Sequence, residues 1–192
     1  LAEDLGRIAV ALAEGPVGRL HVTYEGAVGD RATELLTRAV LRGALAATDD
    51  GVNLVNAYRL AESRGIDVQE TRQRACDYAG LVRVAAGGAE VAGTLIGGRP
   101  WLVRALGYEV EIELGGAMLF LLNEDRPGMI GHIGTALGAS RVNIANMNVS
   151  RNREGGRALT AIQVDEPLPD DAAGRLAEID GATRVRVVRL LG

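Results

Sequence analysis

The sequence predicts an α+β fold built in two parts, residues 1–114 and residues 117–192. In the first part, helical patterns alternate with short strands and Gly-rich turns. In the second part, the elements follow the order strand–helix–strand–strand–helix–strand. Gly115 and Gly116 separate the two patterns, and a Gly pair between periodic segments is typical of a connection. We therefore place the domain boundary there.

The composition excludes several classes of protein. The chain has 192 residues, of which 47% are apolar and 24% charged, as in ordinary globular domains. A net charge of −4 argues against a nucleic-acid partner, and no apolar run reaches the roughly 18 residues of a membrane span. Cys76 is the only cysteine, which excludes an intrachain disulfide and a Cys-based metal site. We expect a cytoplasmic protein without signal peptide, membrane contact or bound metal.

The first part predicts a mixed domain with a mostly antiparallel sheet. Apolar residues recur at helical spacing from the first residue on, without a start signal, so we expect that further chain precedes Leu1 in the natural protein. Gly87-Gly88 suits a two-residue hairpin turn, and Gly65 suits the end of a helix. We predict helices over 1–13, 30–47 and 54–63, with Asp30 as a cap, and strands over 18–25, 66–74, 78–86, 89–96, 101–106 and 109–114.

The second part predicts a four-stranded sheet with two helices. Pro127 lies in the first turn of a helix, where its missing N–H costs nothing, and Glu154-Gly155-Gly156 forms a hairpin turn. We predict strands over 117–122, 141–150, 157–164 and 183–190, and helices over 127–139 and from Pro169 or Asp170 to Ile179. This order matches the ferredoxin-like arrangement, with helices on one face and an open edge that favours side-by-side dimerisation.

Glycines punctuate the predicted helix that follows Pro127. They stand at positions 128, 131, 134 and 138, which is not the GxGxxG spacing of a dinucleotide-binding loop. Each interior Gly costs a helix roughly 0.5–1 kcal/mol relative to Ala, so a reason is expected. Close packing against a neighbour and close approach of a ligand are both compatible with the pattern.

Few residues of the first part suggest chemistry. His21 stands alone on the polar face of its strand, and Cys76 has no neighbouring base, so both are interpreted as structural. Arg83, Arg99 and Arg104 form a possible second anion site, because guanidinium groups suit carboxylates and phosphates. The alternative is that these three are solvated surface arginines.

Two stretches of the second part carry a family resemblance, and three stretches of the first part carry another. NEDRPGMIG followed by VNIANM resembles the ligand-binding signature of an ACT domain, an amino-acid-sensing module. The first part is similar to the intervening domain, of the allosteric substrate-binding type, in the long form of D-3-phosphoglycerate dehydrogenase. It carries this likeness in GVNLVNAYRLAESRGIDVQET, DYAGLVRV and AGTLIGGRP. The two resemblances together cover the whole chain.

The resemblance implies a parent enzyme that oxidises 3-phosphoglycerate with NAD, in the first step of L-serine biosynthesis. This chain shows neither a GxGxxG after a strand nor a His/Glu/Arg catalytic constellation. We therefore expect no catalytic residue and no cofactor here, with NAD bound by the missing catalytic part. The expected role is allosteric regulation of the parent oxidoreductase.

The resemblance also implies an effector site at Asn123, Asp125, Gly128 and Asn143, between two ACT domains. Asp125 would accept from the ammonium of L-serine or another small amino acid, and the two amides would bind its carboxylate and hydroxyl. Backbone N–H groups after Pro127 would favour the carboxylate. The alternative is structural, because Asn and Asp form turns and cap helices by bonding their own backbone.

Two further functions stay open. The same domain types occur in the β-subunit of an iron–sulfur L-serine dehydratase, although this chain has one Cys and no Ser-rich, His-containing N-terminal segment. In the other alternative, the second part serves only for self-association, without any ligand. Relatives inhibited by serine commonly carry a ring-bearing residue at the position of Asn123, which favours this last alternative.

Overall fold

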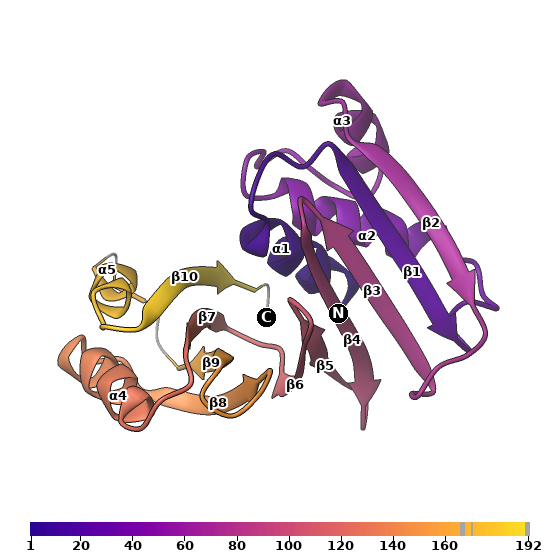
Figure 1. The fold of residues 1–192 in the computed structure, drawn as a ribbon. Coiled ribbons are helices and arrows are strands. Elements are labelled where there is room, and N and C mark those ends of the chain that lie inside the picture. Colours follow the sequence, from indigo (N-terminus) through magenta and orange to yellow (C-terminus); the bar gives the residue numbers. More distant parts are fainter. Residues whose placement is uncertain (166–167, 170, 191–192) are drawn as a thin grey trace. The chain divides into compact units, whose positions relative to one another are not determined.

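The computed structural model describes residues 1–165, 168–169 and 171–190, and the chain forms two compact units (Figure 1). The first comprises Leu1–Gly107 and the second Tyr108–Gly192. The division falls before the Gly115-Gly116 pair, which lies inside the second unit. There, Gln163 donates to the carbonyl of Gly115 (3.3 Å). Within the described residues, no helix has both the length and the apolar character needed to cross a membrane.

The first unit is a sheet with two helices packed on one face. Its strands take the order β2-β1-β3-β4-β5, and β1 and β2 form the parallel pair among antiparallel neighbours. This confirms the predicted mixed domain with a mostly antiparallel sheet. The elements are α1 (Ala2–Leu12), β1 (Arg19–Gly26), α2 (Glu34–Leu45), α3 (Ala57–Ser63), β2 (Asp67–Gln73), β3 (Gly80–Ala86), β4 (Ala89–Ile96) and β5 (Arg99–Ala105).

The core of the first unit lies between this sheet and the helices α1 and α2. Alternate residues of β1 point toward the helices, and Leu20, Val22 and Tyr24 are fully buried there. Leu5 and Ile8 of α1 are equally buried, as their spacing along one helix face predicts. The predicted turn at Gly87-Gly88 is confirmed, since both residues have positive φ (53° and 84°), which glycine adopts without strain.

The two helices α1 and α2 approach each other at a pair of glycines. A Cβ built on Gly6 would lie 2.0 Å from the carbonyl oxygen of Val40, and one on Gly43 would lie 1.9 Å from that of Glu3. No side chain fits at such distances, so the crossing requires both glycines. Beside the crossing, Arg42 of α2 forms an ion pair with Glu3 of α1 and so links the same two helices.

Four predicted helix starts are wrong. The helix predicted over 127–139 begins at Met129, with Gly128 as its N-cap, so Pro127 precedes the helix and does not lie in its first turn. α2 begins at Glu34, with Thr33 as its N-cap, because residues 27–30 form a turn that contains Asp30. α3 begins at Ala57, because the side chain of Asn53 accepts from two backbone N–H groups and holds the preceding residues in a turn. The last helix begins at Ala172 rather than Pro169, and Asp170 lies outside the described residues.

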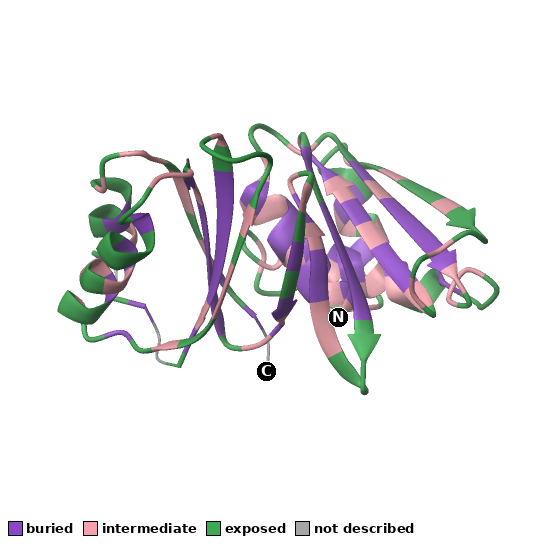
Figure 2. Ribbon diagram, turned by 60° about the horizontal axis from the view of Figure 1, so that its bottom comes forward, coloured by how far each residue is buried: buried purple, intermediate pink, exposed green. Residues whose placement is uncertain are grey.

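The second unit has the predicted ferredoxin-like topology. Its elements are β6 (Tyr108–Glu113), β7 (Ala117–Glu124), α4 (Met129–Ala139), β8 (Ile144–Arg151), β9 (Arg157–Val164), α5 (Ala172–Ala177) and β10 (Ala182–Arg189). The sheet order β10-β7-β9-β8 leaves β10 and β8 at the edges. Leu119, Leu121 and Ile162 pack with Ile133 and Leu137 of α4. In Figure 2 the outer surfaces of α4 and α5 are mostly exposed, whereas the strands beside them are buried.

Packing within one copy of the chain does not explain the interior glycines of α4. A Cβ on Gly131, Gly134 or Gly138 would meet no atom of the chain within 4 Å, so close packing within a single copy, one of the two alternatives, does not account for them. Gly128 differs from them, because it is the N-cap of α4 and has φ +88°, a conformation that favours glycine.

Substitution of glycine by alanine should therefore have opposite effects on stability in the two units. We expect Gly43→Ala to lower the free energy of unfolding by about 1–3 kcal/mol, because the new methyl group overlaps the backbone of α1. Chemical denaturation followed by the fluorescence of Trp101, the single tryptophan, measures this for the first unit.

The matched control is Gly131→Ala, which adds a methyl group in open space. It should stabilise the second unit by about 0.5–1 kcal/mol, measured by circular dichroism. Equal effects of the two substitutions would contradict the role assigned to the helix crossing.

Candidate functional site

The loop between β7 and α4 is held from two sides. The Asp125 carboxylate accepts from Nη1 of Arg151 (3.3 Å) and from the backbone N–H of Gly155 (3.1 Å), while its own N–H donates to the carbonyl of Gly156 (2.9 Å). On the other side, Arg126 binds the carboxylate of Asp180 (2.7 Å). The loop is thus fixed before any ligand arrives. Asp125 lies at its half-buried centre, where it can accept from an ammonium group.

Asn123 does not face the surface. It points to the helix face of β7, is only 3% exposed, and accepts from the hydroxyl of Thr160 (3.0 Å). Its amide nitrogen donates to the carbonyl of Glu124 (2.7 Å). Each end of this amide has one partner in the unit, and the side chain is buried, so a ligand would have to reach it below the surface. The role of Asn123 as an effector contact stays a prediction.

Gly128 lies next to Asp125 on the same loop and begins α4. It is exposed, and a Cβ there would approach no atom except the ring of His132, at 4.0 Å. The positive φ of Gly128 therefore matters more than the space around it. This conformation turns the chain from the loop into the helix.

Asn143 lies at the opposite end of the same sheet. It precedes β8, is exposed, and donates to the carboxylate of Asp165, the residue that follows β9. Asn123, by contrast, pairs with Ala158 near the start of β9. Seven residues of strand separate Ala158 from Asp165, which corresponds to about 23 Å at about 3.3 Å per residue. One copy therefore brings Asn123, Asp125 and Gly128 together but keeps Asn143 far from them.

This arrangement offers polar and charged groups suited to binding a small polar ligand. The Asp125 end offers a carboxylate, a guanidinium and backbone N–H groups, and the Asn143 end offers an amide beside a second carboxylate. No group of three His, Cys, Asp or Glu residues suited to a metal ion occurs in the part of the chain that the structure describes. Sequence reasoning missed Arg151, although its place just before the Gly155-Gly156 turn was a usable signal.

The three arginines proposed as an anion site do not form one cluster. Arg83 and Arg104 both stand opposite Ala92, on the two sides of β4, whereas Arg99 pairs with Ile96 at the far end of β4. Arg83 binds the carboxylates of Glu25 (2.8 Å) and Glu90 (2.7 Å), and Arg104 binds Asp77 (3.3 Å).

Carboxylates thus already balance two of these guanidinium groups. Burial lowers the pKa of Arg83, but its hydrogen bonds to Glu90 and Glu25 outweigh burial and leave this pKa raised. An anion would compete with these carboxylates, and the second anion site stays a prediction.

His21 and Cys76 take part in local contacts. The His21 ring lies 2.8 Å from the hydroxyl of Thr71, across the parallel β1–β2 pair. Cys76 packs against the small apolar cluster of Leu81, Ala92 and Val103, and its sulfur accepts from the backbone N–H of Tyr78. Both contacts fit the structural interpretation of these residues.

A polar network that the sequence did not reveal joins α2, α3 and β2. The carboxylate of Glu70 accepts from the hydroxyls of Thr37 (2.7 Å), Thr33 (3.1 Å) and Tyr58 (3.0 Å). Thr37 also bonds the hydroxyl of Tyr24 (2.7 Å), whose pKa burial raises to about 12. Burial raises the pKa of Glu70, but the hydroxyl donors and the charge of Arg72 prevail, so its pKa lies below the ordinary value.

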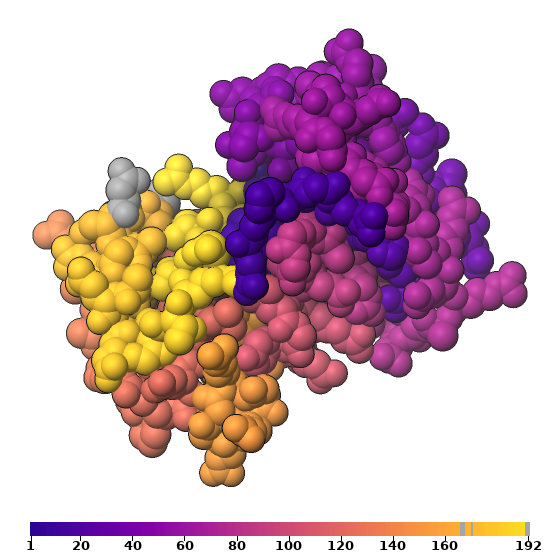
Figure 3. Space-filling model, turned by 45° about the horizontal axis from the view of Figure 1, so that its top comes forward, coloured from indigo at the N-terminus to yellow at the C-terminus, as the bar shows by residue number. Residues whose placement is uncertain are grey.

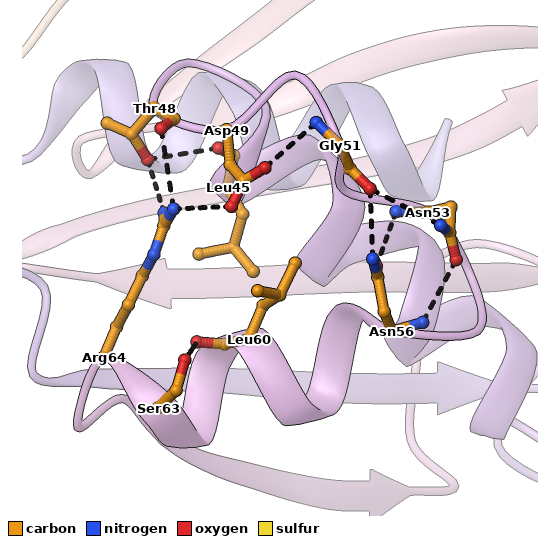
Figure 4. A network of polar contacts seen from close by, with 9 residues as sticks. All are labelled: Leu45, Thr48, Asp49, Gly51, Asn53, Asn56, Leu60, Ser63 and Arg64. Carbon is orange, nitrogen blue, oxygen red and sulfur yellow. Dashed lines mark hydrogen bonds and ion pairs between the residues drawn. The ribbon is translucent and has the colours of Figure 1, made fainter.

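A second network orders the connection between α2 and α3 (Figure 4). Asn53 and Asn56 both donate to the carbonyl of Gly51 (3.4 and 3.0 Å), which closes the turn before α3. Arg64, at the end of α3, reaches back to Thr48 (2.5 Å) and Asp49 (2.9 Å). Figure 4 also shows the hydroxyl of Ser63 bonded to the carbonyl of Leu60 within α3 (2.9 Å). These bonds join parts of the connection and α3 to one another, which makes this network structural.

Comparisons with known proteins assign both units. Residues 1–104 match the family model of the D-3-phosphoglycerate dehydrogenase intervening domain, and residues 117–181 match that of the ACT domain. D-3-phosphoglycerate dehydrogenases from Methanocaldococcus jannaschii and Synechocystis are 32% and 34% identical to the chain, and that of Bacillus subtilis is 29% identical. Each alignment covers 99% of this chain but only 37%, 36% and 38% of these relatives.

The low pKa of Glu70 predicts the acid sensitivity of the first unit. A carboxyl whose pKa is lower in the folded than in the unfolded state stabilises the fold fully above the unfolded value, about 4.5. This contribution is lost as the pH falls below that value and through the folded pKa. We therefore expect Glu70→Gln to be less stable than the wild type at neutral pH and to lose less stability on acidification.

Denaturation followed by Trp101 fluorescence across the acid range measures the effect. The control Glu62→Gln removes one charge from the exposed surface of α3 without touching the threonine hydroxyls, and should follow the wild-type profile. An unchanged acid slope in Glu70→Gln would contradict the prediction.

Proposed function

Because the chain belongs to the D-3-phosphoglycerate dehydrogenase family, as an intervening domain joined to an ACT domain, we propose that it is the effector-sensing regulatory region of such an enzyme. The proposed effector is a small amino acid, L-serine first, which the pathway of the parent enzyme produces. The parent would carry the NAD site and the catalytic residues in the part not seen here. All three relatives named above bear dehydrogenase names, which leaves the dehydratase alternative without support from them.

The observation that carries this proposal is the separation of Asp125 from Asn143. About 23 Å of sheet lies between the two ends, which no single small amino acid can bridge. A site that uses both residues must therefore take them from two copies of the chain. This requirement agrees with the open edge of the sheet, because β8 has a partner strand on one side only.

Pairing of two β8 edges supplies the missing geometry. β8 begins just after Asn143 and ends at Arg151, which contacts Asp125. If two copies pair through β8 in antiparallel fashion about a two-fold axis, the start of one strand lies beside the end of the other. Asn143 of one copy then lies near Asp125 of its partner. Exposed Val149 on this edge and exposed Ile130 on α4 provide apolar surface for the contact.

The chemistry of the shared site matches an amino acid. Asp125 accepts from the ammonium group, and the amide of Asn143 donates to or accepts from the ligand hydroxyl or carboxylate. Binding changes the parent enzyme only if the ligand has different affinities for two states of the assembly, which is the condition for allosteric control. The region would thus report L-serine to the catalytic part without taking part in the reaction.

A second candidate function has one observation in its favour. The amide of Asn123 is buried and bonds Thr160 and Glu124 of its own unit, as expected of a module that binds no ligand. On this alternative, the ACT unit serves only for self-association. Light scattering and calorimetry with and without L-serine distinguish the two functions, since a constitutive module gives a dimer that releases no heat with the amino acid.

The two-copy site predicts complementation between variants. Asp125→Ala and Asn143→Ala should each abolish L-serine binding measured by calorimetry. When the two variants are mixed, unfolded and refolded together, a mixed dimer contains one site with both residues intact. Statistical pairing then restores roughly a quarter of the wild-type sites.

The control is each variant refolded alone, which should restore none. A site built within one copy predicts no recovery in the mixture, and absence of binding to the wild type would overturn the proposed function itself.

A further inference from the structure

We propose that Arg151 is the carboxylate-binding residue of the effector site and so selects ligands that carry both an ammonium and a carboxylate. This inference rests on the proposed function and adds to it a residue that the sequence did not point to. It concerns the Asp125 end of the site, where a guanidinium and a carboxylate already lie in contact.

The geometry of the pair provides a complement to an amino acid. Nη1 of Arg151 lies 3.3 Å from Oδ2 of Asp125, and the N–H of Gly155 donates to the same oxygen. Among the described residues, no donor lies within hydrogen-bonding distance of Oδ1 of Asp125. An ammonium group can therefore bind Oδ1 while a carboxylate binds the remaining nitrogens of Arg151. The ligand then extends the existing ion pair without breaking it.

The exposure of the pair indicates that its purpose is not the stability of the fold. The side chains of Arg151 and Asp125 are 57% and 23% exposed, and exposed ion pairs contribute little to folding. The loop has further support from two backbone bonds, one from Asp125 to Gly156 and one from Glu124 to Gly181 (2.9 Å each). Arg151 is thus accessible to solvent, and the loop does not depend on it alone.

The backbone fixes the position of Arg151. It is the last residue of β8 and stands opposite Ala158 of β9, so its Cα is set by the sheet rather than by a mobile loop. The turn that follows is closed by Asn152, which accepts from the N–H of Arg157 (2.9 Å). In the view of Figure 3 the orange residues around this turn project from the surface of the second unit. Arg suits this role because its planar group binds a carboxylate through two parallel hydrogen bonds.

The same position lies next to the second copy in the proposed assembly. Antiparallel pairing of two β8 edges places the end of one β8, and hence Arg151, beside the start of the other and its Asn143. The ammonium and the carboxylate of the ligand would then be held by one copy, and the side chain would face the amide from its partner. This division predicts that Arg151 controls the demand for a carboxylate, and Asn143 the choice of side chain.

A comparison of L-serine with ethanolamine, which lacks only the carboxylate, tests the proposal. Calorimetry should show that Arg151→Gln binds L-serine at least about tenfold more weakly than the wild type, as expected for the loss of a charge-assisted hydrogen-bonded pair. Its affinity for ethanolamine should change by less than about twofold, because that ligand has no group for Arg151 to bind. Arg151→Lys keeps the charge but loses the planar guanidinium group. Its affinity for L-serine should therefore lie between that of the wild type and that of Arg151→Gln.

The matched control is Arg175→Gln, which breaks a comparably exposed pair with Asp171 on α5 and should leave both affinities unchanged. Equal thermal unfolding of all variants excludes misfolding as the cause. If Arg151→Gln binds L-serine as the wild type does, or if both ligands weaken alike, Arg151 does not bind the carboxylate. If the wild type itself binds no L-serine, the proposed function fails, and the role of Arg151 fails with it.

Discussion

The rigid length of strand β9 governs what this chain can do. Its start lies beside the loop of Asp125 and its end beside Asn143, and a strand cannot shorten to bring them together. The two groups that suit an amino acid are therefore permanently apart within one copy. Only an assembly that aligns opposite ends of two sheets can join them. The topology provides such an alignment, because the edge strand β8 runs between the same two ends.

The first unit depends on a different constraint. Its two main helices meet at Gly6 and Gly43, where backbone touches backbone, and the Glu70 network ties α2 and α3 to the parallel strand β2. Two connections, the helix crossing and the Glu70 network, thus join the helices of this unit to one another and to the edge of its sheet.

The sequence was a good guide to the elements and a poorer guide to their polar contacts. Hydrophobic periodicity and the Gly pairs identified both sheets and all five described helices, because these signals arise from the same burial that forms the core. Helix starts were less predictable, since Thr33 competes with Asp30 through bonds to Glu70 and Arg72 that join residues far apart in the chain.

In the candidate site, too, the sequence predicted local features better than contacts between distant residues. Asp125 and Gly128 stand together as neighbours in sequence must, but the burial of Asn123 depends on Thr160 across the sheet. The pairing of Asp125 with Arg151 depends on the closing of a hairpin. The sequence around Asn123 and Asp125 reveals neither partner, and only the hairpin turn that follows Arg151 gave a signal for the second. For the same reason, the sequence listed Asn143 beside Asp125, whereas the fold sets them at opposite ends.

The edge position of β8 has a consequence for how the response depends on the amount of protein. A ligand that binds across two chains stabilises the dimer, so effector binding and dimer formation are thermodynamically linked. Dilution that separates the chains also weakens the apparent affinity for the ligand, and a saturating ligand holds dilute chains together. Within a larger enzyme, other contacts would raise the local concentration of the two edges. The sensitivity of the region would then be set by the architecture around it as much as by the residues of the site.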